Sequence, residues 1–154
     1  MSGNPGDKNF DGYDLGEDFY SPARTVTETD VVNFAGLTGD WHHVHTDALA
    51  ASKSQFGQRI AHGTLTFAIA SGLMARMGIG SEHSMAFLGI RNWNFKAPVF
   101  LGDTIRVRVE VKDKHESRKL DRGVITFLCQ VLNVGRGDEV SSEGEWVQMY
   151  QRNA

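Results

Sequence analysis

An acid and three histidines lie close together in one short polar stretch of the chain. Residues 38–47 read TGDWHHVHTD, and three of the six histidines of the protein fall within four positions. Histidine is the side chain whose ordinary pKa lies nearest neutrality. An aspartate five residues before a histidine, across a loop that contains Gly39, can turn both side chains toward one water molecule. We therefore predict that Asp40 and His45 form a general acid–base pair.

Two other interpretations of this stretch stay open. In the first, the histidines lie in a surface loop and cap the ends of neighbouring helices. In the second, His42, His43 and His45 bind a metal ion. Adjacent histidines rarely point at one ion, however, and the usual zinc-ligand spacings are absent. The acid–base interpretation needs no metal, and we expect none.

A second polar feature precedes the most apolar segment of the chain, which covers residues 63–77. The N-terminus of a helix carries unpaired N–H groups and a partial positive charge, and a glycine there lets a ligand approach the backbone closely. The amide of Gly63 is thus a candidate to hold a developing oxyanion. The competing interpretation is an ordinary helix start at which His62 packs or caps. Ser71, two turns further on, either bonds back to a helix carbonyl or orients a catalytic group.

The apolar segment itself has the periodicity of a helix. Leu65, Ile69, Leu73 and Met77 repeat every four positions, and further apolar residues extend around the cylinder. A helix that is apolar nearly all round is a buried helix. We therefore expect one central helix in the core of the fold.

The other elements follow from capping and alternation patterns. Thr27 with Asp30 three positions later resembles a capping box and predicts a helix from about Thr27 to Gly39, with a short second helix over residues 47–52. Alternating apolar residues predict a half-buried antiparallel strand over residues 104–114. Further strands are expected over residues 85–94, 124–134 and 138–151. This order predicts an α+β fold in which an antiparallel sheet wraps around the central helix.

Length and composition fit one domain. The chain has 154 residues, of which 40% are apolar and 23% charged, which is enough for a single sizeable core. Cys129 is the only cysteine, so no intrachain disulfide can form. No apolar stretch has the length of a membrane span and the N-terminus lacks signal-peptide features, which predicts a cytoplasmic protein without a membrane partner. We expect a flexible tail over residues 1–12 and the domain over residues 13–154.

Charge is spread unevenly along the chain. The net charge of −3 argues against a nucleic-acid partner. Residues 1–30 hold seven acids and two bases, whereas residues 91–122 hold nine bases and five acids. The basic stretch forms either solvated strand faces or a local rim that attracts a phosphate-bearing ligand.

Three stretches of the sequence resemble the MaoC-like hydratases, the (R)-specific enoyl-CoA hydratases of the hotdog fold. Residues 34–47 are similar to the family signature. That signature begins with an aromatic and a small residue, continues with Ser/Thr-Gly-Asp and then Asn-Pro, and ends with a histidine and, two positions later, an acid. Residues 60–63 with Ser71-Gly72 match a second stretch. FKAPVFLGD at residues 95–103 is similar to the family's Phe-x-x-Pro-Val-x-x-Gly-Asp. The resemblance covers about residues 15–150.

The resemblance implies hydration of a trans-2-enoyl-CoA to an (R)-3-hydroxyacyl-CoA, or the reverse dehydration. Asp40 and His45 would activate the water, the Gly63 amide would polarise the thioester carbonyl, and Ser71 would support the pair. Coenzyme A belongs to the substrate, so no separate cofactor is implied. The family works as homodimers or higher oligomers. The residues expected to contact the substrate are His42, His62, Arg91 and Lys96.

One departure from the family and two rival functions stay open. Where the family has Asn-Pro, this chain has His42-His43, so the loop loses the rigid proline, and His42 is expected to replace the asparagine as a hydrogen-bond donor. A hotdog thioesterase usually carries its acid on the central helix, but residues 63–77 contain no carboxylate. A non-catalytic acyl-CoA or acyl-carrier binding module would need neither Asp40 nor His45.

Overall fold

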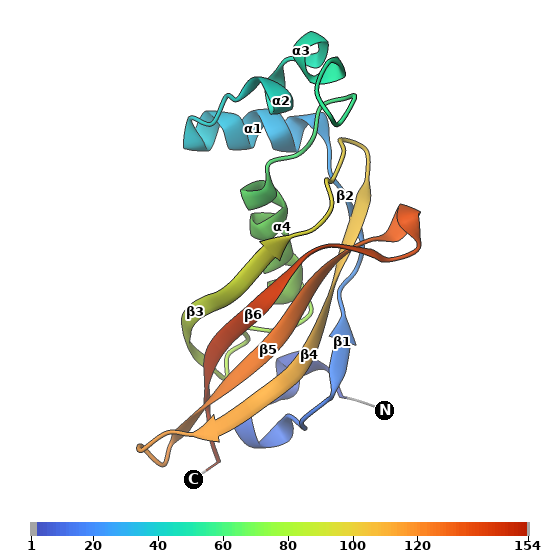
Figure 1. Cartoon of the computed structure of the whole chain (residues 1–154). Helices are drawn as coiled ribbons and strands as arrows, with labels where there is room; N and C mark the ends of the chain where they lie inside the picture. The colour runs from blue at the N-terminus through green and yellow to red at the C-terminus, as the bar shows by residue number, and fades with distance from the viewer. Residues whose placement is uncertain (1–2, 154) are drawn as a thin grey trace.

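In the computed structural model, which describes residues 3–153, a long helix packs against one face of a curved antiparallel sheet (Figure 1). The helix is α4 (Gly63–Arg76). The strands are β1 (Asp18–Tyr20), β2 (Arg24–Thr25), β3 (Ser84–Phe95), β4 (Thr104–Glu116), β5 (Arg122–Asn133) and β6 (Glu139–Gln151). Their order is β1-β4-β5-β6-β3, with β2 also paired to β4. The predicted α+β fold, an antiparallel sheet around a central helix, is confirmed.

The face of the sheet that meets α4 follows from the alternation of apolar residues in the strands. The residues of β4 and α4 in the core are Ile105, Val107, Val109, Val111, Leu65, Ile69, Ala70, Leu73 and Met74. Phe127 and Cys129 of the central strand β5 are fully buried beneath the helix. Burial raises the pKa of the Cys129 thiol to about 12, so this cysteine is a packing residue.

One face of α4 is not covered within the chain. Thr64, Ala68, Gly72 and Ala75 are exposed along it, so the expected burial all round the helix is wrong for this face. The sheet covers the helix from one side, and the shorter helices lie beyond its N-terminal end (Figure 1). Within residues 3–153, no helix combines the length and apolarity that crossing a bilayer requires.

The helices before α4 form close to the predicted places. In α1 (Glu28–Thr38), Thr27 and Asp30 make the expected capping box, and Gly39 ends the helix in the left-handed region with φ 78°. Asp47 caps α3 (Ala48–Ser52). Between them, α2 (His43–Thr46) is a single helical turn that the sequence patterns did not predict. These three helices carry the polar stretch to the start of α4.

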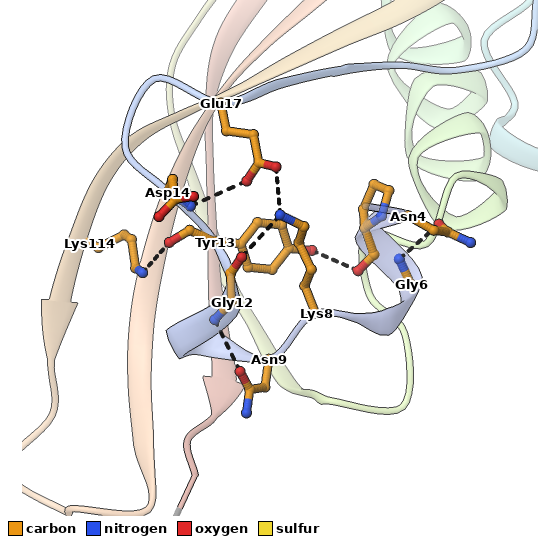
Figure 2. Close-up of polar contacts among 10 residues, drawn as sticks. Asn4, Gly6, Lys8, Asn9, Gly12, Tyr13, Asp14, Glu17 and Lys114 are labelled. Carbon is orange, nitrogen blue, oxygen red and sulfur yellow. Dashed lines mark hydrogen bonds and ion pairs between the residues drawn. The ribbon is translucent and has the colours of Figure 1, made fainter. Parts of the chain in front are cut away.

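The segment before β1 is folded onto the sheet. It contains two 3-10 turns, Pro5–Asp7 and Phe10–Gly12, and Phe10 is 5% exposed. Figure 2 shows its polar contacts: Lys8 Nζ donates to Gly12 O at 3.0 Å and pairs with Glu17, and Tyr13 OH donates to Pro5 O at 3.1 Å. The expected flexible tail is therefore wrong for residues 3–12, because Phe10 buries its ring in the core. Met1 and Ser2 lie outside the described residues.

Five of the nine bases in the basic stretch of residues 91–122 are paired with carboxylates. Its paired bases are Lys96, Arg106, Arg108, Lys112 and Arg122, each with a carboxylate partner. Arg108, for example, lies 2.9 Å from Asp18 and 2.7 Å from Glu110. Arg108 and Asp18 face one another on the neighbouring strands β4 and β1 and neutralise locally. For the five paired bases the interpretation as solvated strand faces is therefore the one that fits.

Candidate active site

A cavity of about 460 Å³ opens where the polar stretch meets the N-terminus of α4. Its lining residues include Asp40, His45, His62, Gly63, Phe95 and Lys96. The lining therefore brings together residues from the α1–α2 loop, the start of α4 and the end of β3. The two predicted acid–base residues and the predicted oxyanion amide share one cavity.

Asp40 is held by the local geometry of the loop that follows α1. The left-handed Gly39 donates its N–H to Ala35 O at 2.8 Å and turns the chain away from the helix axis. The Asp40 amide then donates to Thr38 Oγ1 at 3.2 Å. Its carboxylate Oδ1 accepts the His42 amide at 3.2 Å. Asp40 lines the cavity, so its carboxylate can meet a ligand there.

His45 lies on α2, and its ring is oriented by a backbone carbonyl. Nδ1 lies 2.8 Å from Ile60 O. A carbonyl only accepts, so Nδ1 carries the hydrogen and Nε2 is the free base in the neutral ring. Burial lowers the pKa of His45; the His62 and His42 rings lower it further, while the Ile60 bond and the Asp40 charge oppose these effects. A neutral His45 with a free Nε2 can accept a proton from water.

His62 is the most buried polar residue of the site. Its side chain is 1% exposed. Nε2 lies 2.9 Å from Asp40 O, and the ring stacks on His45 with centroids 3.9 Å apart and planes at 27°. It makes no side-chain cap to α4, so the interpretation that it packs is the one that fits.

A metal ion, if bound, would have a different ligand set from the one considered above. One ligand atom from each of Asp40, His45 and His62 can be chosen so that all lie within 4.8 Å of one another. His43 is not a member of this cluster. His42 is used elsewhere: its Nδ1 accepts the Val44 amide at 3.3 Å and caps α2. Nδ1 of His42 is therefore an acceptor, which leaves the hydrogen of the neutral ring on Nε2, and the donor role expected for His42 stays a prediction.

Gly63 is the first residue of α4. The first N–H groups of a helix have no acceptor within the helix, so the Gly63 amide is available to the cavity. Phe95 packs directly on this glycine: a Cβ built on residue 63 would lie 2.8 Å from Phe95 Cε1. Close packing against Phe95 therefore favours glycine at this position.

The remaining predicted residues divide between the cavity and the surface. Lys96 lines the cavity and pairs with Glu143. Arg91 lines a separate groove with Leu88 and His115. Within a single chain it therefore does not lie at the cavity that contains Asp40 and His45. The Ser71 hydroxyl donates to Ala68 O at 2.7 Å, which is the ordinary back-bond of a helical serine, and Ser71 is not among the lining residues.

Sequence reasoning missed the segment that holds the pair in place. The Ile60 carbonyl accepts from the His45 ring, and Arg59 Nε donates to His45 O at 2.7 Å. The Ile60 amide also donates to Val44 O at 3.2 Å. Residues 59–62 therefore lie along residues 40–45. The one sequence feature that could have indicated this docking is Arg59, a basic residue directly before Ile60-Ala61-His62-Gly63.

Comparison with known proteins gives consistent relatives. The model of the MaoC like domain matches residues 13–130. Protein MaoC of Klebsiella aerogenes is 41% identical over 70% of this chain, which spans only 31% of that protein's length. The 3-hydroxybutyryl-CoA dehydratase of Methylorubrum extorquens is 36% identical over 79% of this chain and 71% of that protein. An (R)-specific enoyl-CoA hydratase of Rhodospirillum rubrum is 36% identical over 81% of this chain and 80% of that protein.

Solved structures share the architecture. A monoamine oxidase regulatory protein from Archaeoglobus superposes with a TM-score of 0.88 at 34% identity, over 100% of this chain and 99% of that one. The (R)-hydratase of A. caviae involved in PHA biosynthesis gives 0.75 at 26% identity, over 91% and 98% of the two chains. A Mycobacterium tuberculosis protein with a double hotdog fold gives 0.82 over 96% of this chain and 45% of that one; at 21% identity this likeness concerns the fold alone.

Proposed function

Because the chain belongs to the family of MaoC-like domains and has the hotdog fold, we propose that it is a hydro-lyase acting on coenzyme A thioesters. The reaction is addition of water to a trans-2-enoyl-CoA to give an (R)-3-hydroxyacyl-CoA, or the reverse dehydration. The relatives named as hydratase and dehydratase support this reaction class. The observation that carries the proposal is the shared cavity of Asp40, His45 and Gly63.

In the proposed reaction, Asp40 and His45 bind one water molecule between them. As the water oxygen bonds to the β carbon, the pair takes one proton from the water and delivers one proton to the α carbon. The electron pair of the double bond shifts toward the thioester, and negative charge develops on its carbonyl oxygen. The Gly63 amide at the N-terminus of α4 donates to that oxygen, and the helix dipole favours the charge.

Lys96 is the residue of this chain that we assign to the coenzyme A part of the substrate. It lies at the cavity, and its side chain is 49% exposed, so it reaches solvent at the cavity mouth. Its partner Glu143 is held also by Gln130 Nε2 at 2.8 Å. A phosphate that displaces Glu143 would receive a charge-assisted hydrogen bond from Lys96.

We also propose that the working unit is a homodimer joined along β3. This strand forms an edge of the sheet and carries the exposed apolar side chains of Met85, Phe87, Leu88, Ile90 and Phe95. A long apolar edge strand left open would promote uncontrolled association. Light scattering should give twice the mass of the chain, and Leu88→Glu should shift the protein toward monomer. Leu120→Glu, which changes an exposed leucine away from the sheet edges, should leave the mass unchanged.

The activity is tested with crotonyl-CoA by following loss of the enoyl absorbance and the chirality of the product. Asp40→Asn and His45→Gln should each abolish hydration. Asp47→Asn and His43→Gln change the same residue types in the same stretch, outside the cavity lining, and should keep it. Release of free coenzyme A thiol would instead indicate a thioesterase, and binding without turnover across chain lengths a binding module. Loss of activity on chelation would contradict a metal-free mechanism.

A further inference from the structure

We propose that His62 is a positioning residue, whose buried ring fixes both members of the acid–base pair. Calling Asp40 and His45 an acid–base pair rests on the proposed function. The contacts that His62 makes with these two residues are independent of it. His62 lines the cavity but is only 1% exposed, and it contacts Asp40 and His45 in two different ways. The positioning role proposed here is separate from the substrate contact expected from the family resemblance.

The contact with Asp40 acts on the main chain. The Asp40 carbonyl only accepts, so Nε2 of His62 carries the hydrogen of the 2.9 Å bond. This bond ties the loop after α1 to the residue that precedes α4. The Asp40 peptide cannot rotate without breaking it, and the direction of the Asp40 side chain follows from the orientation of that peptide.

The contact with His45 acts on the ring plane. The two imidazoles are stacked at 3.9 Å and 27°, while His45 Nδ1 is bonded to Ile60 O at 2.8 Å. The bond fixes one edge of the His45 ring, and the stack prevents rotation about that edge. Together they direct Nε2 of His45 along a single line.

The ring of His62 is itself held in place by a neighbour, and one of its ring nitrogens lowers the stability of the fold. Phe34 meets it edge-on with centroids 5.0 Å apart. Nδ1 is buried and has no hydrogen-bond partner among the described residues. A buried acceptor without a partner destabilises the fold, so an apolar ring would be the better choice for stability alone. The donor at Nε2 is what the imidazole adds.

His62 also joins the two halves of the site. It is the residue directly before Gly63, with φ −59° and ψ 136° at the N-cap of α4. The bond to Asp40 therefore fixes the distance between the acid–base pair and the amide proposed as oxyanion donor. Hydration needs both ends of the enoyl group held at once, and misplacement of about 1 Å in such an arrangement can cost about 100-fold in rate.

Two variants separate the two contacts. His62→Phe keeps a flat ring against His45 and loses the donor to Asp40, and His62→Gln keeps a donor near the Nε2 position and loses the stack. We expect kcat to fall about 100-fold in His62→Phe and less in His62→Gln, with KM changed less than about twofold. His115→Gln, at a histidine whose side chain is 57% exposed on β4, should match the native enzyme.

A second measurement reads the position of His45 without using activity. Long-range proton–nitrogen NMR of the imidazoles should find His45 with its hydrogen on Nδ1 in the native protein and in His62→Phe, which keeps the stacked ring, and a mixture of tautomers in His62→Gln, which loses the stack. Thermal unfolding identifies a variant that fails to fold. If His62→Phe fails to fold, the kcat and the His45 tautomer of His62→Gln decide whether His62 is a positioning residue. An unchanged His45 tautomer with native kcat in the folded variants would overturn the proposal. A native protein that hydrates no enoyl-CoA would overturn the proposed function, while the NMR result would still decide the positioning role.

Discussion

Phe95 at the end of β3 lies directly on Gly63 at the start of α4: a Cβ on residue 63 would sit 2.8 Å from Cε1 and 3.0 Å from Cδ1 of that ring. The ring covers the glycine on one side and leaves its amide at the cavity. Since both residues line the same cavity, the packing of this pair controls access to the amide.

Gly63→Ala should therefore lower activity without unfolding the protein. The added methyl group pushes Phe95 from its place and narrows the approach to the amide, and we expect kcat to fall by about 10- to 100-fold. Residue 63 is the first position of the helix, where alanine gains less than the about 1 kcal/mol of a helix interior, and the displaced Phe95 ring offsets that gain, so the melting temperature should change little. Enoyl-CoA hydration and thermal unfolding check both points. Adding Phe95→Ala removes the clash and should restore part of the activity; no recovery would exclude crowding by Phe95 as the cause.

The low pKa of His45 should appear in the pH dependence of the rate. Burial places this pKa below the ordinary 6.5, and the base is active when neutral. The acid limb of kcat/KM should accordingly fall below pH 6.5. Asp40 is a nearby charge that raises the pKa of His45, so in Asp40→Asn the His45 resonances should titrate at lower pH than in the native protein. A His45 titration above 6.5 would contradict the burial of the ring.

The same shift links stability to pH. The pKa of His45 is lower in the folded than in the unfolded protein, so the unfolded chain binds more protons at this residue. Well above pH 6.5 His45 is neutral in both states and does not affect the free energy of unfolding. As the pH falls through 6.5, its protonation in the unfolded chain destabilises the fold. The free energy of unfolding should decrease from pH 7.5 to pH 5.5 by less in His45→Gln than in the native protein. Urea unfolding at the two pH values measures the difference, and His43→Gln serves as the control for a histidine outside the cavity lining.

The sequence predicted the features that depend on neighbouring residues and missed those that depend on contacts between distant positions. The capping box of α1, the helix at residues 63–76 and the alternation in β4 are local patterns, and each appears where it was expected. Asp40, His45 and Gly63 could each be picked out from a short motif, and they line one cavity. The docking of residues 59–62 along residues 40–45 joins positions 14 to 22 apart, and no local period encodes it. The ion pair between Arg108 of β4 and Asp18 of β1 depends on strand register for the same reason.

Arg59 provides a test of that docked segment. Its Nε donates to His45 O at 2.7 Å, and Nη1 lies 2.6 Å from Glu28 Oε1 on α1. Arg59→Lys cannot make both contacts with the planar fork, and we expect a loss of about 1 kcal/mol in the free energy of unfolding together with a lower kcat. Glu28 is 67% exposed, so Glu28→Gln should cost less than about 1 kcal/mol. Equal effects of the two changes would mean that the ion pair, and not the bond to His45, is what matters.

The folded segment before β1 makes a prediction about stability. Phe10 is 5% exposed and packs so closely on β5 that a Cβ at Gly123 would lie 2.4 Å from its ring. Truncating a buried phenylalanine typically costs about 3–5 kcal/mol, and Phe10→Ala should lower the unfolding midpoint accordingly. Leu15 is 65% exposed, so Leu15→Ala should stay within about 0.5 kcal/mol of the native protein. If Phe10→Ala were as stable as Leu15→Ala, the segment would not be part of the core, because a loose tail contributes nothing to the free energy of unfolding.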